Sequence, residues 1–248
     1  MHYEEIESIW IEGIKHNINV ETSTTCIVHC AMCPRAAIHL PLDNPIRKQF
    51  MKELEETQPL SIDDFCKLSD FFKSLSLCGV FSDPIYWKEF PKALEIISEK
   101  YLDVDYRVST AAHGPSIDWY ESMFKKCSKN VHWIMGVDGV NGDTSRLYRE
   151  RQNSELMIEA FSLASKKYKL QVTWQFIIFE HNVDELNQAK QLALDSDMAF
   201  LEVISDRLDL DVINRLNVNL GRENNTKDKI RVYTMPENSE IWKGKNYK

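Results

Sequence analysis

"LQVTWQFIIFEHNVDELNQAKQLALDSDMAFLEVIS", residues 170–205, predicts a strand, a helix and a second strand in succession. Residues 170–179 begin with alternating apolar and polar side chains and end fully apolar, as is typical of a strand covered on both faces. A helix is expected from Val183 to about Leu194, and residues 199–205 form the next strand. Two strands joined through a helix pair in parallel with a right-handed crossover. The stretch therefore predicts an α/β fold.

The same alternation recurs along the rest of the chain. Further strands are expected at residues 18–22, 74–79, 104–110 and 131–137. The other helices are expected at residues 61–72, 90–101, 116–127 and 154–168. The first of these helices opens on Ser61, and Asp64 three residues later resembles the second half of a capping box. Six strand–helix steps predict either an open doubly wound sheet or an incomplete barrel of mostly parallel strands.

The domain organisation follows from where this pattern starts and stops. We expect one core domain over residues 18–205, preceded by an N-terminal extension at residues 1–17. Residues 206–248 are polar and rich in Asn, so we expect a tail that is packed on the core or partly disordered.

Composition and charge limit the classes of function. The chain has 248 residues, of which 43% are apolar and 27% charged, as in globular proteins. No apolar run approaches the roughly 20 residues of a membrane span, and the N-terminus is acidic where a secretory signal is basic. We therefore expect a cytoplasmic protein without a membrane partner. The net charge of −8 gives no indication of nucleic-acid binding.

Three cysteines stand in the polar turn directly after the first predicted strand. "TTCIVHCAMCPR", residues 24–35, carries Cys26, Cys30 and Cys33 with small or polar residues among them, which is not a core-packing pattern. In a reducing compartment such thiols favour metal binding over disulfides. The remaining cysteines are expected to pack as small apolar side chains in helix and strand interiors: Cys66, Cys78 and Cys127.

Two kinds of metal site are candidates for these three cysteines. A closed zinc site needs a fourth ligand, and the nearby His29 adjoins Cys30, which makes joint chelation of one ion difficult. An iron–sulfur cluster fits better, because thiolates are its usual ligands and closely spaced cysteines can reach different corners of one cube. Three cysteines on a four-iron cube leave one iron without a protein ligand.

At these residues the chain resembles the radical S-adenosylmethionine (SAM) superfamily. Its members carry the Cys-x3-Cys-x2-Cys loop after the first strand, as Cys26, Cys30 and Cys33 do here. The resemblance covers about residues 18–205 and implies a partial (β/α)6 barrel, the radical SAM core. It also implies a [4Fe–4S] cluster on the three cysteines, with the open iron bound by SAM.

The resemblance also implies SAM contacts elsewhere in the chain. They fall on Met32, Asp83, Ser109, Gly136, Arg149 and Asn182. Asp83, in "GVFSDP", would place a carboxylate against the SAM amino group, although Ser82 replaces a usual glycine. Ser109 lies in "RVSTAAHG", which resembles a family segment that ends in Asn-Gly. Met32 would pack on the adenine.

The other three contacts come from two later segments. In "IMGVDGVNGDTSRLYR", Gly136 replaces the serine that usually meets the ribose. Arg149, or Arg146 in an alternative register, would pair with the SAM carboxylate as a charge-assisted fork. Asn182 in "FEHNVDEL" matches a family asparagine, and it is also a candidate N-cap for the following helix.

The reaction that the resemblance implies is radical chemistry. A reduced, oxygen-sensitive cluster would cleave SAM to a 5′-deoxyadenosyl radical, which abstracts hydrogen from a substrate. A flavodoxin or ferredoxin would donate the electron. No cysteine follows Cys127, so we expect a compact member without a SPASM or twitch extension for auxiliary clusters. A small-molecule or nucleotide substrate is favoured over a peptide, and no catalytic residue beyond the cluster ligands is assigned.

The sequence gives weaker indications of the residues that line the barrel or cover it than of the cysteine loop. The candidates for the lining are His113, Trp119, His132, Trp133, Trp174 and Glu180, although isolated aromatic and His side chains are more often core. The loop at residues 38–60 and the C-terminal tail are expected to close over the substrate side.

Two other classes of function stay open. In one, the trio forms an iron–sulfur or zinc site, completed by a partner's ligand, and the chain is a binding module without SAM chemistry. In the other, the trio is a metal-free, redox-sensing set of thiols.

Overall fold

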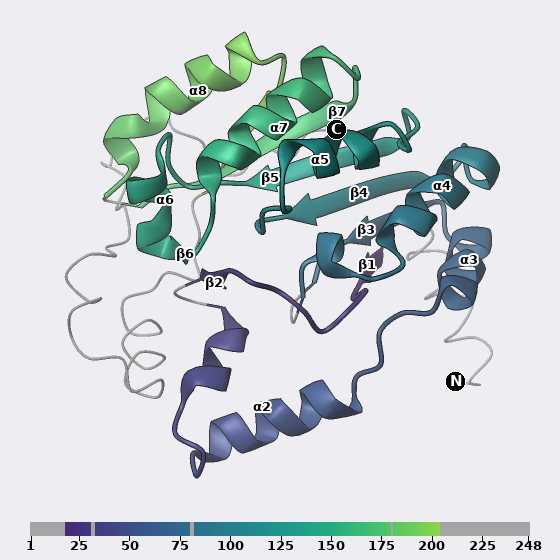
Figure 1. Cartoon of the computed structure of the whole chain (residues 1–248), viewed down its shortest axis with the longest axis vertical. Helices are drawn as coiled ribbons and strands as arrows, with labels where there is room; N and C mark the ends of the chain where they lie inside the picture. The colour runs from purple at the N-terminus through teal and green to yellow at the C-terminus, as the bar shows by residue number, and fades with distance from the viewer. Residues whose placement is uncertain (1–17, 31–32, 80–81, 180, 204–248) are drawn as a thin grey trace, which may run out of the picture.

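The strands form one parallel sheet, in agreement with the sequence. The structure is a computed structural model that describes residues 18–30, 33–79, 82–179 and 181–203 (Figure 1). Six strands pair in the order β1-β3-β4-β5-β7-β8, and every neighbouring pair is parallel. Their bounds are β1 Ile18–Val20, β3 Ser74–Leu77, β4 Asp105–Thr110, β5 Val131–Gly136, β7 Gln171–Ile177 and β8 Ala199–Val203. The predicted α/β partial barrel of parallel strands is confirmed.

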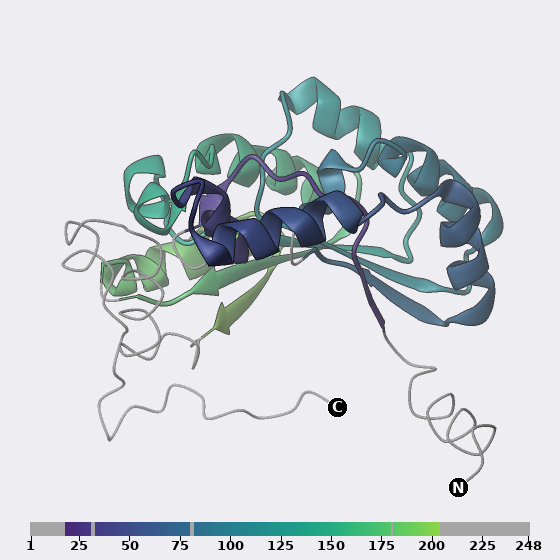
Figure 2. The same ribbon diagram turned by 90° about the horizontal axis from the view of Figure 1, so that it is seen from below.

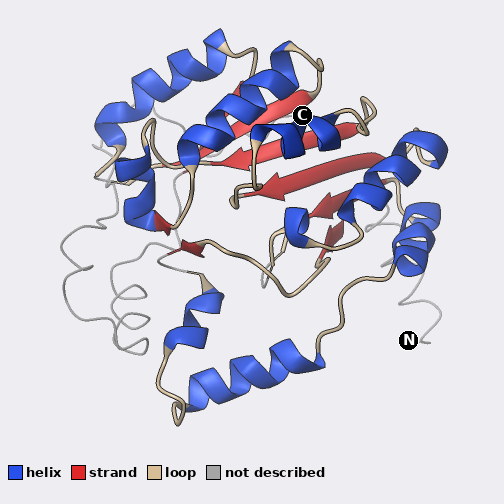
Figure 3. Cartoon of the chain, viewed as in Figure 1, coloured by secondary structure: helices blue, strands red, loops and turns tan. Residues whose placement is uncertain are grey.

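The helices connect successive strands of this sheet, as predicted. Their bounds are α3 Ile62–Phe71, α4 Phe90–Lys100, α5 Ile117–Phe124, α7 Ser154–Lys166 and α8 Leu186–Asp195. Figure 2 shows α4, α5 and α7 on one side of the sheet, and Figure 3 shows the strand arrows pointing in a common direction. The carboxyl ends of the strands therefore meet at one edge.

Local capping fixes where several of these helices begin. The Ser61 hydroxyl accepts a hydrogen bond from the Asp64 amide at 3.1 Å and donates one to the Asp64 carboxylate at 2.7 Å. Ser116 caps α5 and Asn153 caps α7 in the same manner. A side-chain oxygen at this position satisfies a backbone N–H that has no partner within the helix. The predicted N-cap at Ser61 is confirmed, but Asp64 accepts from the Ser61 hydroxyl and not from its backbone N–H as in a full capping box.

The core lies between the sheet and these helices and is rich in aromatic rings. Trp133 of β5 is fully buried, with ring centroids 5.5 Å from Phe124, 5.6 Å from Phe161 and 5.7 Å from Phe90. Trp174 of β7 is also fully buried and donates its indole N–H to the Val137 carbonyl at 2.8 Å. Two of the tryptophans proposed for the barrel lining are therefore core residues. Such rings stabilise a core through large buried apolar area and edge-to-face contacts.

The opposite face of the sheet is polar. Register places one residue from each of five neighbouring strands in a single row, which we call the polar row: Asn19, Ser76, Arg107, His132 and Gln171. Along β7 burial alternates, with Val172, Trp174 and Phe176 buried and the residues between them more exposed. The expectation that this strand is covered on both faces is therefore wrong, and Ile178 and Phe179 lie beyond its end.

Other elements were not predicted. A 3₁₀ helix, η1 (Pro34–His39), and α2 (Pro45–Glu56) occupy much of the segment expected to be a loop. α6 (Gly142–Tyr148) and two short strands, β2 (His29–Cys30) and β6 (Arg149–Glu150), also appear. The short helix η2 (Pro84–Tyr86) was not predicted either, whereas η3 (Val183–Glu185) forms the first turn of the helix expected from Val183.

Some expectations fall where the structure makes no statement. The N-terminal extension at residues 1–17, the tail at 206–248, Met32 and Glu180 lie outside the described residues. Within the described ranges, no helix has the length and apolar character needed to cross a bilayer.

Candidate metal centre

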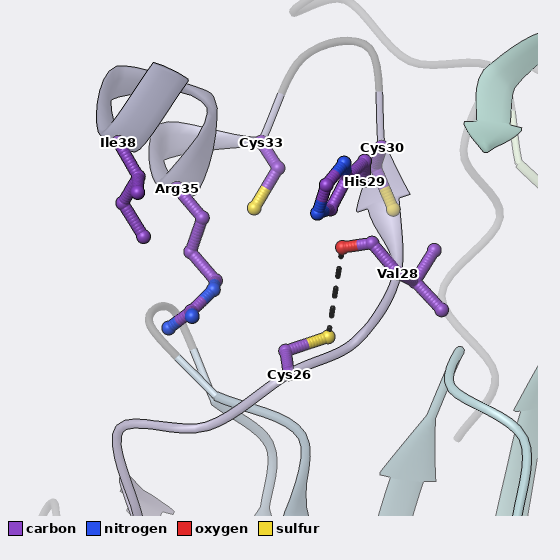
Figure 4. Close-up of a pocket in the computed structure, with 7 residues that line it drawn as sticks. All are labelled: Cys26, Val28, His29, Cys30, Cys33, Arg35 and Ile38. Atoms are coloured by element: carbon purple, nitrogen blue, oxygen red, sulfur yellow. Dashed lines mark hydrogen bonds between the residues drawn. The ribbon is translucent and has the colours of Figure 1, made fainter. Parts of the chain in front are cut away.

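The three cysteines of the loop after β1 line one cavity. It has a volume of about 130 Å³ and its walls are formed by Cys26, Val28, His29, Cys30, Cys33, Arg35 and Ile38 (Figure 4). Figure 4 shows the Cys26 and Cys33 sulfur atoms beside this space, Arg35 and Ile38 on the side of η1, and the Cys30 sulfur behind β2 in this view. The three cysteines thus line the same cavity, and their role as metal ligands stays a prediction.

Backbone contacts fix the loop against the carboxyl edge of the sheet. The Asp83 amide, beyond the end of β3, donates to the Thr25 carbonyl at 2.9 Å. Arg35 Nη1 donates to the Thr24 carbonyl at 2.6 Å, which ties η1 back to the loop. The Cys33 amide donates to the Cys30 carbonyl at 3.1 Å in a tight turn. The cysteines are thus held at the edge where parallel α/β sheets bind their ligands.

A second connection comes from far along the sequence. β2 pairs antiparallel with β6, so that His29 faces Glu150 and Cys30 faces Arg149. β6 directly follows α6, which itself follows β5. The middle cysteine is therefore anchored to the end of the fourth strand in the sheet order as well as to its own loop.

Burial governs the charge state of these thiols. Burial raises the pKa of Cys26 to about 12, and the nearby Asp83 carboxylate adds to the effect. Burial raises the pKa of Cys30 to about 11, while the charge of Arg149 acts in the opposite direction. Both groups are protonated thiols near neutral pH, so binding of a metal group there releases protons.

The donor set suits a soft metal group larger than one ion. Thiolates select zinc, copper(I) and iron–sulfur clusters. Across the described ranges, no three His, Cys, Asp or Glu side chains gather closely enough to hold a single ion. The three thiols are among the residues that line one cavity. Three sulfur donors around such a space fit a cube-shaped iron–sulfur cluster.

Asp83 lies beside this site and is heavily hydrogen-bonded. Its carboxylate accepts from the Ala111 and Ala112 amides at 2.9 Å each and from the Ile85 amide at 3.3 Å. Burial raises the pKa of Asp83, and the hydrogen bonds from Ala112, Thr110 and Ala111 oppose that effect. The carboxylate therefore ties the segment after β3 to the end of β4. Its predicted contact with the SAM amino group stays a prediction.

Arg149 is buried and paired within the protein. Its Nε lies 2.6 Å from the Asp138 carboxylate, in a pair whose side chains are 10% and 0% exposed. Its Nη1 donates to the Cys30 sulfur at 3.7 Å. Arg146, the alternative, is half-exposed and bonds Asp143 on the same helix at 2.9 Å. The structure thus brings Arg149, and not Arg146, to the cysteines.

Gly136 lies against the Arg149 guanidinium. A Cβ atom at Gly136 would approach Arg149 Nη2 to 3.1 Å and the Ala111 side chain to 3.4 Å. The absence of a side chain thus leaves the space in which the guanidinium sits. A serine at this position would compete with Arg149 for it.

Asn182 cross-links the ends of β5 and β7. It is fully buried; its Oδ1 accepts from the Phe179 amide at 2.7 Å, and its Nδ2 donates to the carbonyls of Asp138 and Ile177. Asn182 precedes η3, but its side chain makes no capping hydrogen bond. The alternative prediction of a side-chain N-cap is therefore wrong.

Ser109 and the remaining cysteines lie apart from the cavity. Ser109, on β4, is half-buried and hydrogen-bonds the thiol of Cys78. Cys78 follows the end of β3 and is exposed, so the expectation that it packs within a strand is wrong. Cys127 packs against the core as predicted, and Cys66 is half-buried on α3.

Sequence reasoning missed Gln152 at this edge. Gln152 is buried, and its Nε2 donates to the Ala111 carbonyl at 2.6 Å and to the Gly136 carbonyl at 2.8 Å. Its Oε1 accepts from the Ser145 hydroxyl at 2.5 Å. The residue follows an Arg-Glu-Arg run that reads as solvent-exposed, so only the fold reveals that it joins β4, β5 and α6.

No protein-family model and no curated protein match this sequence. Among solved structures, SuiB of Streptococcus suis bound to its precursor peptide SuiA is similar with a TM-score of 0.56 and 13% identity. The match covers 87% of this chain and 47% of that one. SuiB bound to S-adenosylmethionine gives 0.54 at 11% identity, over 92% of this chain and 54% of that one.

A third similar structure is a radical SAM methyltransferase from Sphaerobacter thermophilus. Its TM-score is 0.51 at 12% identity, and the match covers 83% of this chain and 63% of that one. This chain therefore spans about half to two thirds of the length of the structures it matches. At these identities the likeness establishes the fold, which is the partial barrel of the radical SAM enzymes.

Proposed function

We propose that this chain, which has the fold of the radical SAM enzymes, is itself a radical SAM enzyme. It would hold a [4Fe–4S] cluster on Cys26, Cys30 and Cys33 and bind SAM at the iron that lacks a protein ligand. The observation that carries the proposal is the cavity that these three thiols line at the carboxyl edge of a six-stranded parallel sheet. That edge is where barrels of this kind place their active sites.

The bound cluster would supply one electron for reductive cleavage of SAM to a 5′-deoxyadenosyl radical, which abstracts hydrogen from the substrate. The protein's own residues would bind the cluster and SAM, orient them, and shield them from water. The Thr25–Asp83 backbone bond and the β2–β6 pairing fix the loop on two sides. Val28 and Ile38 give the cavity an apolar wall, which limits the access of water.

We propose SAM contacts at Asp83, Ser109, Gly136, Asn182 and Met32, whereas Arg149, the sixth candidate, lies against the Cys30 sulfur. Apart from Met32, which lies outside the described residues, these residues lie at or just beyond the carboxyl ends of strands. A nucleoside bound across that edge would need contacts from several such segments. An external electron donor such as flavodoxin or ferredoxin belongs to the same proposal.

A small polar molecule or a nucleotide is our proposed substrate class. The polar row lies on the sheet face opposite the aromatic core, nearer the amino ends of β5 and β7 than the carboxyl edge, and includes Arg107, an exposed cation. His132 is hydrogen-bonded through Nε2 to the Thr173 hydroxyl at 2.8 Å on the same face. Guanidinium, imidazole and hydroxyl groups suit an anionic, hydrogen-bonding ligand. A peptide is the second candidate, because the SuiB structure was solved with a precursor peptide.

Anaerobic reconstitution tests the assignment directly. We expect brown protein with about four irons per chain and formation of 5′-deoxyadenosine from SAM under dithionite. Cys30→Ala should lose both properties, whereas Cys127→Ala, a cysteine outside the cavity, should keep both.

The other outcomes decide among the competing classes. A cluster that is reduced without cleaving SAM would identify a binding or electron-transfer module. Stoichiometric zinc would identify a structural metal site. Colourless, metal-free protein whose thiols oxidise reversibly would identify a redox sensor. Each of these results contradicts the proposal.

A further inference from the structure

We propose that Arg149 donates a charge-assisted hydrogen bond to the sulfur of Cys30 and thereby raises the reduction potential of the cluster bound there. This inference rests on the proposed function. It assigns Arg149 to the iron–sulfur group, in place of the SAM carboxylate to which the sequence resemblance points.

Cys30 and Arg149 meet through both main chain and side chain. They are direct partners in the β2–β6 pairing, although 119 positions separate them in the sequence. From this position the guanidinium of Arg149 reaches the Cys30 sulfur, with Nη1 3.7 Å from Sγ. Cys30 and Arg149 are thus joined by a main-chain pairing and by a side-chain hydrogen bond, which together hold Nη1 next to the sulfur.

The guanidinium is oriented by its surroundings before any ligand arrives. Its Nε lies 2.6 Å from the carboxylate of Asp138, which is fully buried and also accepts the Ile177 amide at 2.7 Å. The ring of Tyr148 lies 5.3 Å from the guanidinium carbon, within the range of a cation–π contact. Gly136 leaves room for Nη2. Nη1 is therefore directed at Cys30.

Such a donor changes the energy of the two redox states unequally. Reduction adds negative charge to the cluster and its thiolates, so a cationic hydrogen-bond donor stabilises the reduced form more than the oxidised form. Arg149 and its partner Asp138 are buried, which limits screening of the guanidinium charge by water. Asp138 acts in the opposite direction, but of these two charges that of Arg149 has the larger effect on the Cys30 thiolate. The net result is a higher potential.

The test is a redox titration of reconstituted protein, with Arg149→Lys as the variant. Lysine keeps a positive charge for Asp138 but lacks the planar fork that reaches two partners at once. We expect the midpoint potential to fall, with about a tenfold lower ratio of reduced to oxidised cluster at a fixed potential. For a one-electron couple that is about 59 mV. Arg146→Lys, on the exposed face of α6, should leave the potential unchanged.

Gly136→Ala provides a second variant in case Arg149→Lys does not assemble a cluster. Its Cβ would crowd Nη2 at 3.1 Å and displace the guanidinium while every charge is kept. We expect a smaller fall in potential in the same direction.

The dissociation constant for SAM, measured on the same proteins, separates the possible results. An unchanged potential in both variants, together with weaker SAM binding in Arg149→Lys, would overturn the inference and assign Arg149 to SAM. The proposed function would survive that result, since the parent would still bind a cluster and cleave SAM. A parent that assembles no cluster would overturn the function and this inference together.

Discussion

At the scale of single residues, Asp138 organises the carboxyl edge. Its two carboxylate oxygens bind different elements, Oδ2 the Arg149 guanidinium and Oδ1 the Ile177 amide. Its carbonyl accepts from Asn182. In the sequence, Asp138 directly follows the strand predicted at residues 131–137, but its distance along the chain from Arg149, Ile177 and Asn182 does not reveal that they are its partners. They become visible only once α6 returns Arg149 to the end of β5.

Replacement of Asp138 by Asn should destabilise the fold. Asparagine keeps an acceptor for the Ile177 amide but leaves the buried Arg149 charge without a counterion. Breaking a buried pair in this way costs about 3–5 kcal/mol. Denaturant unfolding of the apoprotein measures the loss. Asp143→Asn, which removes an exposed partner of Arg146, should change stability by less than about 1 kcal/mol. Equal effects of the two variants would contradict the assignment.

Asn182→Ala should also lower the free energy of unfolding. It leaves the Phe179 amide and two carbonyls without their hydrogen bonds in a fully buried position. Buried groups left unsatisfied cost about 1–3 kcal/mol each, and water reaching the cavity offsets part of this. We expect a loss of about 3 kcal/mol. Asn153→Ala, which removes only the cap of α7, should cost about 1 kcal/mol.

At the scale of elements, α2 and η1 form a separate unit. Ala37, Leu40 and Phe50 are buried together in a small cluster apart from the main core. The sequence carried a signal for α2, since Asn44-Pro45 is a good helix start and Ile46, Phe50 and Leu54 recur every four residues. Asn44 indeed caps α2 through its side chain.

Phe50→Ala should loosen this unit without unfolding the sheet. The side chain belongs to the small cluster and is not part of the main core cluster, so its loss leaves the aromatic core intact. We expect faster amide hydrogen exchange across α2 and η1 and unchanged protection in β4, β5 and β7. Phe161→Ala, in the main core, should instead lower global stability by about 3–5 kcal/mol. Faster exchange throughout the sheet of the Phe50 variant would show that the two clusters are one.

At the scale of the whole molecule, periodicity predicted the sheet better than the site. Predicted strands such as 104–110 and 131–137 agree with β4 and β5 to within one residue, because a strand that packs helices on one face must bury alternate side chains. β2 and β6 could not be predicted, since each has two residues and exists only through its distant partner. The choice between Arg146 and Arg149 depends on that same pairing.

Stability should depend on pH through two partly buried histidines. Burial lowers the pKa of His113 below 6.5; burial and the charge of Arg107 do the same for His132. The unfolded chain then binds protons more readily than the folded one below pH 6.5. The contribution is complete above that pH and is lost as the pH falls toward the folded-state pKa values. Denaturant unfolding between pH 5 and pH 8 should show less dependence on pH in His132→Gln. If the free energy of unfolding changed equally with pH in parent and variant, the proposed contribution of His132 would be wrong.

The two-residue contact between β2 and β6 also sets an order of events during synthesis. The ribosome releases the chain from its N-terminus, so the loop with Cys30 emerges long before Arg149 exists. Until four strands of the sheet and α6 are made, that thiol lacks its β6 partner, although the contacts of the loop with η1 and Asp83 can already form. Metal loading into a finished site therefore comes only after residue 150 has been made.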